Sequence, residues 1–224
     1  NIIMKLIRGL PVLHDSRQGV VVTLGAFDGL HLGHQALIAR ARERARERNA
    51  RSMMLTFEPM PREYLQPDSA PARLTNFRER WRLAAASGLD ELCVLRFGAR
   101  LRGLTGEAFA QRLAQAFGAT VIVVGHDFRF GRDGTGTAEG LAACGQRLGF
   151  EVEVVAPVKG EGERVSSTAV RESLVAGDFS RAALLLGRRY TMRGRVTRGA
   201  QLGRTLGFPT ANLAPSLFFT FYHR

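Results

Sequence analysis

The segment that decides the fold is Val20-Val21-Val22-Thr23-Leu24-Gly25-Ala26-Phe27-Asp28-Gly29-Leu30-His31-Leu32-Gly33-His34. Its first five residues form a nearly continuous apolar run, which is typical of a strand buried on both faces. Residues 35–48 follow with apolar side chains at helical spacing, which predicts an amphipathic helix. Three glycines and two histidines therefore lie on a strand-to-helix turn.

Such a turn favours an anion, because the first N–H groups of a helix lack partners and the helix dipole is positive there. Glycine lets the backbone approach a phosphate closely, and an imidazole can donate hydrogen bonds to phosphate oxygens. A glycine-rich loop with ordinary histidines is an alternative interpretation. A zinc site is another, although His31, His34 and Asp28 would be an atypical and underliganded set. The pattern favours a polyphosphate site.

Apolar strand-like runs alternate with amphipathic helical runs along the chain, which predicts parallel α/β units. The strand candidates are 20–24, 52–57, 92–97, 121–124 and 150–155, and helices are expected over 35–48, 75–86, 105–118, 137–148 and 178–186. Five strands with intervening helices predict a doubly wound parallel sheet, in which ligands gather beyond the carboxyl ends of the strands. The turns after Leu24, Phe57 and Val124 are therefore expected on one rim.

A second segment, Arg164-Val165-Ser166-Ser167-Thr168-Ala169-Val170-Arg171, is typical of a capped helix start. Ser166 or Ser167 can cap the helix, whose N-terminus then favours an anion. Arg171 lies one turn further along the helix, within reach of an anion at that end. Taken alone, an ordinary cap beside a surface arginine would be the better interpretation.

A third segment, Gly125-His126-Asp127-Phe128-Arg129-Phe130-Gly131, follows the strand that ends at Val124. Its two aromatic rings beside a carboxylate suit a planar ligand with polar edges. A loop whose phenylalanines fill the core explains the same residues equally well.

Together these segments resemble the bacterial bifunctional riboflavin kinase/FAD synthetase family. The H-x-G-H signature at residues 31–34 is that of the nucleotidylyltransferase superfamily, and the longer G-x-F-D-G-x-H-x-G-H form is that of the family. The family's S-S-T-x-x-R motif is similar to residues 166–171, its G-x-D-F-R-F-G loop to residues 125–131, and its F-x-P-x-P turn to residues 57–61. The resemblance implies a Rossmann-like doubly wound α/β domain followed by the start of a β-barrel.

The activity that this resemblance implies is adenylyl transfer from ATP to FMN, which gives FAD and pyrophosphate, with Mg²⁺ as the metal. It assigns catalysis to His31, His34 and Arg171. It assigns ATP binding to Gly25, Phe27, Asp28, Gly29, Gly33, Arg164, Ser166, Ser167 and Thr168, and flavin binding to Phe57, Pro59, Asp127 and Phe128. No protein ligand of Mg²⁺ in this domain follows from the sequence. Met60 stands where relatives often have histidine, and His126 is given no catalytic role.

The last motif, residues 203–212, resembles the G-F-P-T-A-N signature that opens the riboflavin kinase module. By that resemblance, Pro209, Thr210 and Asn212 are a remnant of the kinase site. Thr210 and Asn212 would contact Mg²⁺ and ATP only if the kinase module were complete.

The composition changes near Gly187, so the expected domains are an FMN adenylyltransferase over 1–187 and a truncated kinase barrel over 188–224. The second segment is too short to fold as such a barrel. We therefore expect this chain not to phosphorylate riboflavin, and FMN formed from riboflavin and ATP would contradict this. An unclosed barrel start exposes strand edges, so self-association beyond about residue 190 is expected, and removing residues 188–224 should relieve it.

The chain has 32 Lys and Arg residues against 20 Asp and Glu residues, a net charge of +12. Nonspecific binding of nucleic acid is one consequence of such a charge. However, the densest arginine run predicts an ion-paired helix face, because glutamates lie three or four residues away in the pairs Arg40/Glu43, Glu43/Arg46 and Glu47/Arg51. No specific nucleic acid partner is expected. The expected partners are ATP and FMN, with riboflavin for full-length relatives.

No apolar run is long enough to span a membrane, and the first residues are not a secretory signal. Cys93 and Cys144 are expected as reduced core thiols, so the expected compartment is the cytoplasm.

Two alternative functions stay open at this point. One is another nucleotidylyltransferase with the H-x-G-H signature, and the other is an inactive nucleotide- or nucleic-acid-binding fragment.

Overall fold

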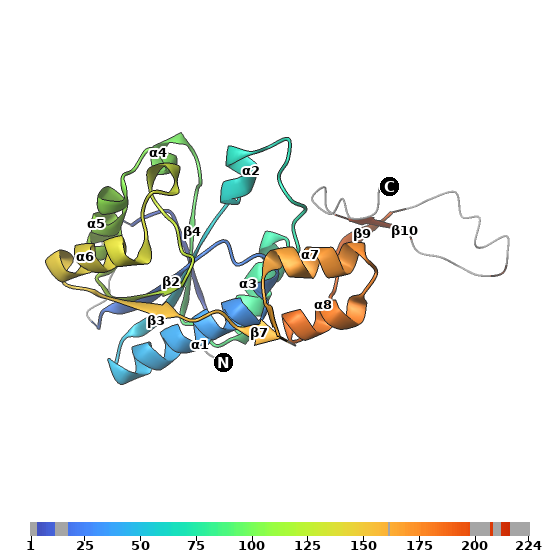
Figure 1. Ribbon diagram of the computed structural model, residues 1–224, viewed down its shortest axis with the longest axis horizontal. Helices are drawn as coiled ribbons and strands as arrows, with labels where there is room; N and C mark the ends of the chain where they lie inside the picture. The colour runs from blue at the N-terminus through green and yellow to red at the C-terminus, as the bar shows by residue number, and fades with distance from the viewer. Residues whose placement is uncertain (1–3, 12–17, 161, 198–206, 208–211, 216–224) are drawn as a thin grey trace.

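The structure is a computed structural model that describes residues 4–11, 18–160, 162–197, 207 and 212–215. Its main body is a six-stranded parallel sheet with helices on both faces (Figure 1). In spatial order the strands are β1 (Lys5–Arg8), β4 (Glu91–Leu95), β3 (Arg51–Phe57), β2 (Val20–Leu24), β5 (Ala119–Gly125) and β6 (Glu151–Val155). The predicted doubly wound parallel sheet is confirmed.

The edge strand β1 is the one that the sequence did not predict. It has four residues, two of them charged at its ends, and it pairs with β4 alone. So short a segment carries too little periodicity to be distinguished from a loop. The predicted strand 92–97 is displaced slightly toward its start, since β4 ends at Leu95.

Helices begin mostly at the predicted caps. The helices are α1 (Leu32–Glu47), α2 (Pro61–Leu65), α3 (Phe77–Ala86), α4 (Ala99–Arg102), α5 (Gly106–Phe117), α6 (Ala138–Leu148), α7 (Ser167–Val175) and α8 (Phe179–Leu186), with short 3-10 turns η1 (Asp28–Leu30) and η2 (Arg132–Gly134). Thr105 caps α5 through its side chain, at the start of the helix predicted over 105–118, and Thr137 caps α6 in the same way. The prediction for 75–86 was wrong at its start, because Asn76 caps α3 and accepts a hydrogen bond from the Glu79 N–H.

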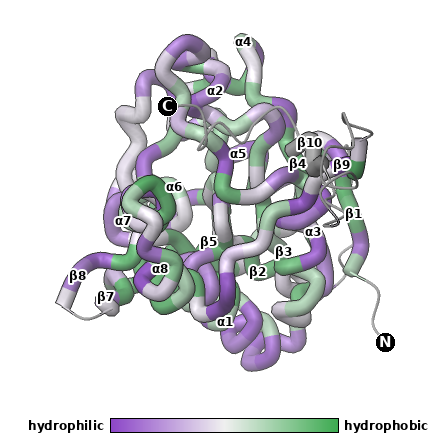
Figure 2. Tube along the Cα trace, turned by 90° about the vertical axis from the view of Figure 1, so that its right-hand side faces the viewer, coloured by the Kyte–Doolittle hydropathy of each residue, from purple (hydrophilic) through white to green (hydrophobic). Residues whose placement is uncertain are grey.

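Two apolar layers hold the helices on the sheet. One face of the sheet carries α5 and α6, and its core contains Phe109, Leu113, Phe117 and Leu141 from the helices with Val20, Val22, Ile122 and Val124 from the strands. The other face carries α1 and α3, with Ile38, Ala41, Ala45 and Ala84 against Val21, Met54, Leu92, Val121 and Val123. The strands at the centre of the molecule are accordingly apolar, while α1 is largely hydrophilic (Figure 2).

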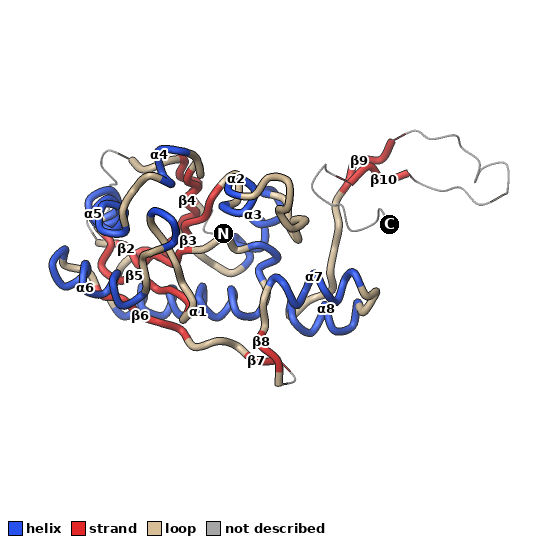
Figure 3. The backbone as a smooth tube through the Cα atoms, turned by 45° about the horizontal axis from the view of Figure 1, so that its top comes forward, coloured by secondary structure: helices blue, strands red, loops and turns tan. Residues whose placement is uncertain are grey.

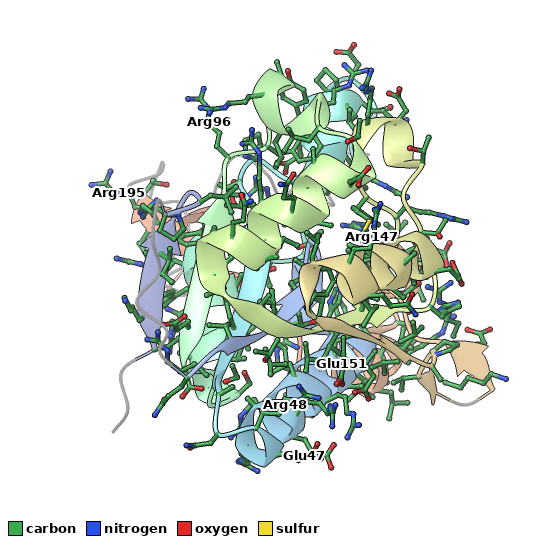
Figure 4. The ribbon with its side chains drawn as sticks, turned by 90° about the vertical axis from the view of Figure 1, so that its left-hand side faces the viewer. Glu47, Arg48, Arg96, Arg147, Glu151 and Arg195 are labelled. Carbon is green, nitrogen blue, oxygen red and sulfur yellow. The ribbon has the colours of Figure 1, made fainter. Side chains whose placement is uncertain are left out.

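Arg40 and Arg44 of α1 are ion-paired both within the helix and with strand β6. The expected Arg40–Glu43 pair is present at 2.6 Å, and Glu47 pairs with Arg44 and lies 4.0 Å from Arg40. Arg51 pairs with Glu91 at 2.9 Å, and no ion pair is found for Arg46 among the described residues. Carboxylates of β6 add the pairs Arg40–Glu153, Arg44–Glu151, Arg44–Glu153 and Arg48–Glu151, and Figure 4 shows Arg48 and Glu151 close to one another.

Beyond the sheet, α7 and α8 form a helical pair at one end of the molecule (Figure 3). A short hairpin of β7 (Lys159–Gly160) and β8 (Glu163–Arg164) precedes them. Past α8, β9 (Gly194–Thr197) pairs antiparallel with β10 (Asn212–Pro215), away from the main body. The sequence of residues 190–196 is strand-like, but Tyr190 to Met192 lie in a loop and β9 begins at Gly194. Among the described residues, none of the helices is sufficiently long and apolar for a membrane span.

The predicted kinase remnant lies largely outside the described residues. Pro209 and Thr210 lie outside the described residues, whereas Asn212 is the first residue of β10. The expectations about Mg²⁺ contacts and self-association in this segment therefore stay predictions.

Candidate active site

A cavity of about 410 Å³ lies beyond the carboxyl ends of β2 and β5. Here the order of the sheet reverses, because the chain passes from β2 to β3 on one side and later to β5 on the other. Open α/β sheets bind ligands at such a switch point. The three segments singled out in the sequence, at residues 25–34, 125–128 and 164–171, all reach this cavity.

Twelve of the predicted site residues line the cavity. They are Gly25, Asp28, His31, Gly33, His34, Asp127, Phe128, Arg164, Ser166, Ser167, Thr168 and Arg171. The two imidazoles and the Arg171 guanidinium therefore share one cleft, although they lie well over a hundred residues apart in the chain.

Four predicted residues do not line this cavity. Phe27 and Gly29 are buried beneath it, and the Phe27 ring contacts that of His34 with centroids 5.1 Å apart. Phe57 packs edge-on against Phe97, and Pro59 lines a separate hollow. Phe57 and Pro59 thus do not line the cavity, whereas Met60, Pro61 and Arg62 do, and the flavin contacts expected of Phe57 and Pro59 stay predictions.

The turn between β2 and α1 has an unusual backbone. Phe27, Gly29 and Leu30 have φ angles of 51°, 79° and 40°, in the left-handed region that residues other than glycine rarely adopt. At Gly29 a Cβ would also lie 2.7 Å from Leu74 Cδ1. Such a backbone persists only where its surroundings fix it.

The Asp28 carboxylate is one part of those surroundings. It accepts hydrogen bonds at 3.0 Å from the N–H groups of Leu74 and Thr75, and one at 3.1 Å from the Thr75 hydroxyl. It is also ion-paired with Arg171, and the residue is only 3% exposed. With its acceptor capacity used in this way, Asp28 anchors the turn to residues 74–75 and to α7. This differs from the predicted ATP contact.

His31 caps α1 with its side chain. Its Nδ1 accepts the N–H of His34 at 3.3 Å, which assigns the ring proton to Nε2. The His31 and His34 rings stack with centroids 3.7 Å apart and an interplanar angle of 18°. Both rings line the cavity, so His31 offers it an N–H donor while its other nitrogen stays on the helix cap.

Both histidines are held neutral. Burial lowers the pKa of His31 from 6.5 to about 4, helped by the positive charges of Arg164, Arg171 and Arg188. Burial also lowers the pKa of His34, with smaller effects from His31 and Arg80. Neutral stacked rings avoid mutual repulsion, and at neutral pH they interact with an anion as hydrogen-bond donors rather than as cations.

The lowered pKa of His31 predicts that acid destabilises the fold. Below pH 6.5 His31 binds a proton in the unfolded chain, whereas in the folded chain it binds one only near pH 4. The free energy of unfolding therefore decreases as the pH falls from 6.5 to about 4. From pH 7.5 to pH 5 the loss is about 2 kcal/mol. Urea unfolding should show a weaker pH dependence for His31→Gln than for the parent. The exposed His126→Gln variant should keep the parental dependence, and identical slopes for His31→Gln and the parent would contradict the prediction.

The N-terminus of α7 supplies the other wall of the cavity. Ser166 is the cap and accepts the Ala169 N–H, whereas the Ser167 hydroxyl donates to the backbone carbonyl of Asp28 at 3.0 Å. The Arg171 Nε donates to the Ala72 carbonyl at 2.7 Å. Two helix N-termini, those of α1 and α7, thus meet at one cavity with Arg171 between them.

The two aromatic rings of the loop after β5 lie in different surroundings. Phe130 is 8% exposed and belongs to the core near Phe109, and Phe128 stacks on Phe130 with centroids 5.4 Å apart. Phe128 and Asp127 line the cavity. Asp127 also forms an ion pair with Arg164 at 2.5 Å, which links the loop to the segment before α7.

The carboxylates that line the cavity are engaged with arginines. Asp28, Glu63 and Asp127 pair with Arg171, Arg73 and Arg164, respectively. Within the described part of the chain, no group of three or more His, Cys, Asp or Glu residues is arranged to hold a metal ion.

Comparison with known proteins assigns the chain to a family. The sequence profile described as FAD synthetase matches residues 13–169. The chain belongs to the FAD synthetase family. A second profile, described as riboflavin kinase, matches residues 186–220. The predicted family is thereby confirmed.

Relatives of this FAD synthetase carry both activities in their names. A bifunctional riboflavin kinase/FMN adenylyltransferase of Pseudomonas fluorescens is 46% identical over 211 residues, which cover 94% of this chain and 68% of that protein. The protein of the same name from Escherichia coli K12 is 42% identical over 212 residues, with the same coverage. A solved structure described as a macrolide-efflux protein from Streptococcus pneumoniae superposes with a TM-score of 0.84 at 34% identity, covering 96% of this chain and 70% of that one.

Several residues at this cavity had not been predicted from the sequence. Met60, Pro61 and Arg62 at the start of α2 line the cavity, and Thr75 holds Asp28. Pro61 lies within the predicted F-x-P-x-P turn, so the motif pointed to the correct segment. Thr75 has no local signal, because its partner lies 47 residues away in the chain.

Proposed function

We propose that this cavity binds ATP and FMN together and transfers the adenylyl group to the FMN phosphate. A phosphate oxygen of FMN attacks the α-phosphorus of ATP, and the bond from that phosphorus to the bridging oxygen of the β-phosphate breaks. FAD and pyrophosphate are formed. Because the FMN phosphate is already anionic at neutral pH, the reaction needs no general base. The barrier comes mainly from bringing two phosphates together and from the charge on the leaving pyrophosphate.

The observation that carries the proposal is that the N-termini of α1 and α7 line the same cavity. We assign the polyphosphate to the N-terminus of α1 with His31 and His34, and to the N-terminus of α7 with Ser166, Ser167 and Thr168. Arg164 and Arg171 supply the formal positive charge. Helix N-termini and aligned donors stabilise developing negative charge without reorganising during the reaction. In this assignment Asp28 acts indirectly, by holding the turn.

We assign the flavin to the side of the cavity formed by the loop after β5 and the start of α2. Phe128 offers an aromatic face, Asp127 a polar edge, and Met60 and Pro61 an apolar surface. Phe57 and Pro59 lie behind this surface and would act on the flavin only through it.

Mg²⁺ enters this proposal as the counterion of ATP. Because the cavity's carboxylates are paired with arginines, the protein offers the ion few ligands, which suits Mg²⁺ held mainly by substrate phosphates and water. The residues present fit an ATP–Mg²⁺ complex better than a dedicated metal site.

The test is to incubate the chain with ATP, Mg²⁺ and FMN and to follow FAD and pyrophosphate. We expect both products in equal amounts, and none when FMN is replaced by a phosphopantetheine or an alcohol phosphate. Pyrophosphate release with those acceptors but not with FMN would favour another nucleotidylyltransferase. Salt-sensitive RNA binding without pyrophosphate release would favour a binding module.

We further propose that the adenylyltransferase unit extends past the boundary expected at residue 187. Arg188 donates hydrogen bonds to the turn before α1, and the Thr191 hydroxyl donates to Glu79 at 2.9 Å. Tyr190 packs on the α7–α8 core. A truncation that tests self-association should therefore remove residues 192–224 rather than 188–224, because the longer deletion also removes these contacts.

A further inference from the structure

Arg188 lies outside the cavity but contacts the turn that forms it. It follows Gly187, which ends α8. Its Nη2 donates to the Gly29 carbonyl at 2.7 Å, and its Nη1 lies 3.3 Å from the carbonyls of both Leu30 and Leu186. The two turn carbonyls belong to the residues immediately before His31, so one guanidinium spans the end of α8 and the start of the histidine segment.

The approach of α8 to this turn is close. Gly187 has a φ angle of 67°, and a Cβ there would lie 2.7 Å from Leu32 Cδ2. The Gln35 side-chain amide donates at 2.8 Å to the carbonyls of Leu30 and Leu186. The Leu30 carbonyl therefore accepts from two side chains, and both of them also contact the end of α8.

The charged group of Arg188 is partly removed from water. Burial lowers the pKa of Arg188, and Glu79 and Tyr190 oppose this effect. Because the ordinary pKa of a guanidinium is very high, Arg188 remains a cation. A partly desolvated guanidinium makes stronger hydrogen bonds to carbonyls than an exposed one. Its neighbour Arg189 is exposed and has no hydrogen bond or ion pair among the described contacts.

We propose that Arg188 is a positioning residue for adenylyl transfer, which holds the carbonyls of Gly29 and Leu30 and so fixes His31 and the start of α1. This rests on the proposed function of the cavity. The turn needs such a clamp, because Leu30 is held at a positive φ that it would not adopt alone. Asp28 fixes the turn from the side of α7, whereas Arg188 fixes it from the end of α8. The segment similar to riboflavin kinase, which begins at residue 186, thus contributes a residue to the first module.

The first test compares the steady-state kinetics of Arg188→Ala, Arg188→Lys and the matched control Arg189→Ala. For Arg188→Ala we expect kcat to fall by roughly 10- to 100-fold with the KM for FMN within about threefold of the parent, because a displaced His31 affects the reacting phosphates rather than the flavin. Arg188→Lys should recover part of the loss, since an ammonium reaches a carbonyl but lacks the planar fork. Arg189→Ala should match the parent.

A second readout is the titration of His31, followed by NMR of labelled histidine. The charged and titratable groups that face His31 are His34 on α1, Asp28 in the turn, Arg164 on β8, Arg171 on α7 and Arg188 after α8. Loss of the Arg188 charge should raise the pKa of His31 in Arg188→Ala, whereas Arg188→Lys should keep it near the parental value. A merely structural role at the end of α8 would change neither value selectively.

The proposal is overturned if Arg188→Ala keeps a kcat within threefold of the parent, or if its kcat falls only in proportion to the folded fraction seen by circular dichroism. If Arg188→Ala fails to fold, the kcat of Arg188→Lys tests the proposal. A parental kcat in Arg188→Lys overturns the positioning role of Arg188, and a kcat several-fold lower supports it. If the parent itself forms no FAD, the proposed function fails. An unchanged His31 titration in Arg188→Ala would then overturn the clamp separately.

Discussion

Replacing His31 with alanine is expected to lower the kcat of FAD formation by about 10²- to 10³-fold, the range found for loss of one preorganised donor to a developing anion. The KM for FMN should stay within about threefold, because the proposed function assigns His31 to the polyphosphate and not to the flavin. His31 Nδ1 accepts the hydrogen bond of the α1 cap, and burial keeps the ring neutral. In the proposed function, the Nε2–H of this neutral ring is therefore the donor to the polyphosphate.

Two further variants separate the donor from the helix cap. His31→Gln keeps an amide donor and should recover part of the activity that alanine loses. His31→Asn keeps a good N-cap but a shorter side chain, so it should restore stability more than turnover. Steady-state kinetics with FMN and ATP varied separately would measure these effects. Equal turnover in His31→Ala and the parent would reject the catalytic assignment.

The second large effect is expected at Asp28, and on stability. Asp28→Ala removes the partner of Arg171 and the acceptor of three hydrogen bonds, and it leaves a charge and two backbone donors buried. Breaking a buried pair in this way costs about 3–5 kcal/mol. Urea unfolding would measure the loss, and the exposed Asp68→Ala variant is the control.

A double variant tests the cause of that loss. If the unpaired Arg171 charge accounts for most of it, Asp28→Ala combined with Arg171→Met should be less destabilised than the sum of the two single variants. Asp28→Asn keeps the volume of the side chain, but its amide group would place N–H donors against the donors that Asp28 accepts from. This variant should therefore also be destabilised. A loss below about 1 kcal/mol in Asp28→Ala would contradict the anchoring role.

Five strands of the sheet, its main helices and the rim with the cavity could be predicted from sequence patterns. All five residues of β2 are buried, as their continuous apolar run predicted, and Thr105, Thr137 and Ser166 cap the helices that follow them. These features depend on interactions within a few residues of the chain, or on apolar periodicity, which a sequence displays directly. The loops after β2 and β5 reached one cavity because parallel strands place their following loops at a common edge, whereas the segment 164–171 comes to the cavity after the β7–β8 hairpin.

Which side chains of those motifs face the cavity, and which residues hold them, depends on contacts between distant parts of the chain. The tertiary structure turned Asp28 toward Leu74 and Thr75, sent Phe130 into the core while Phe128 stayed at the cavity, and brought Arg188 to Gly29 across 159 residues of chain. It also added carboxylates on β6 to the ion pairs within α1. In each of these contacts the two residues lie far apart along the chain. The packing of the whole domain sets the distance between them, so a local sequence pattern cannot predict the contact.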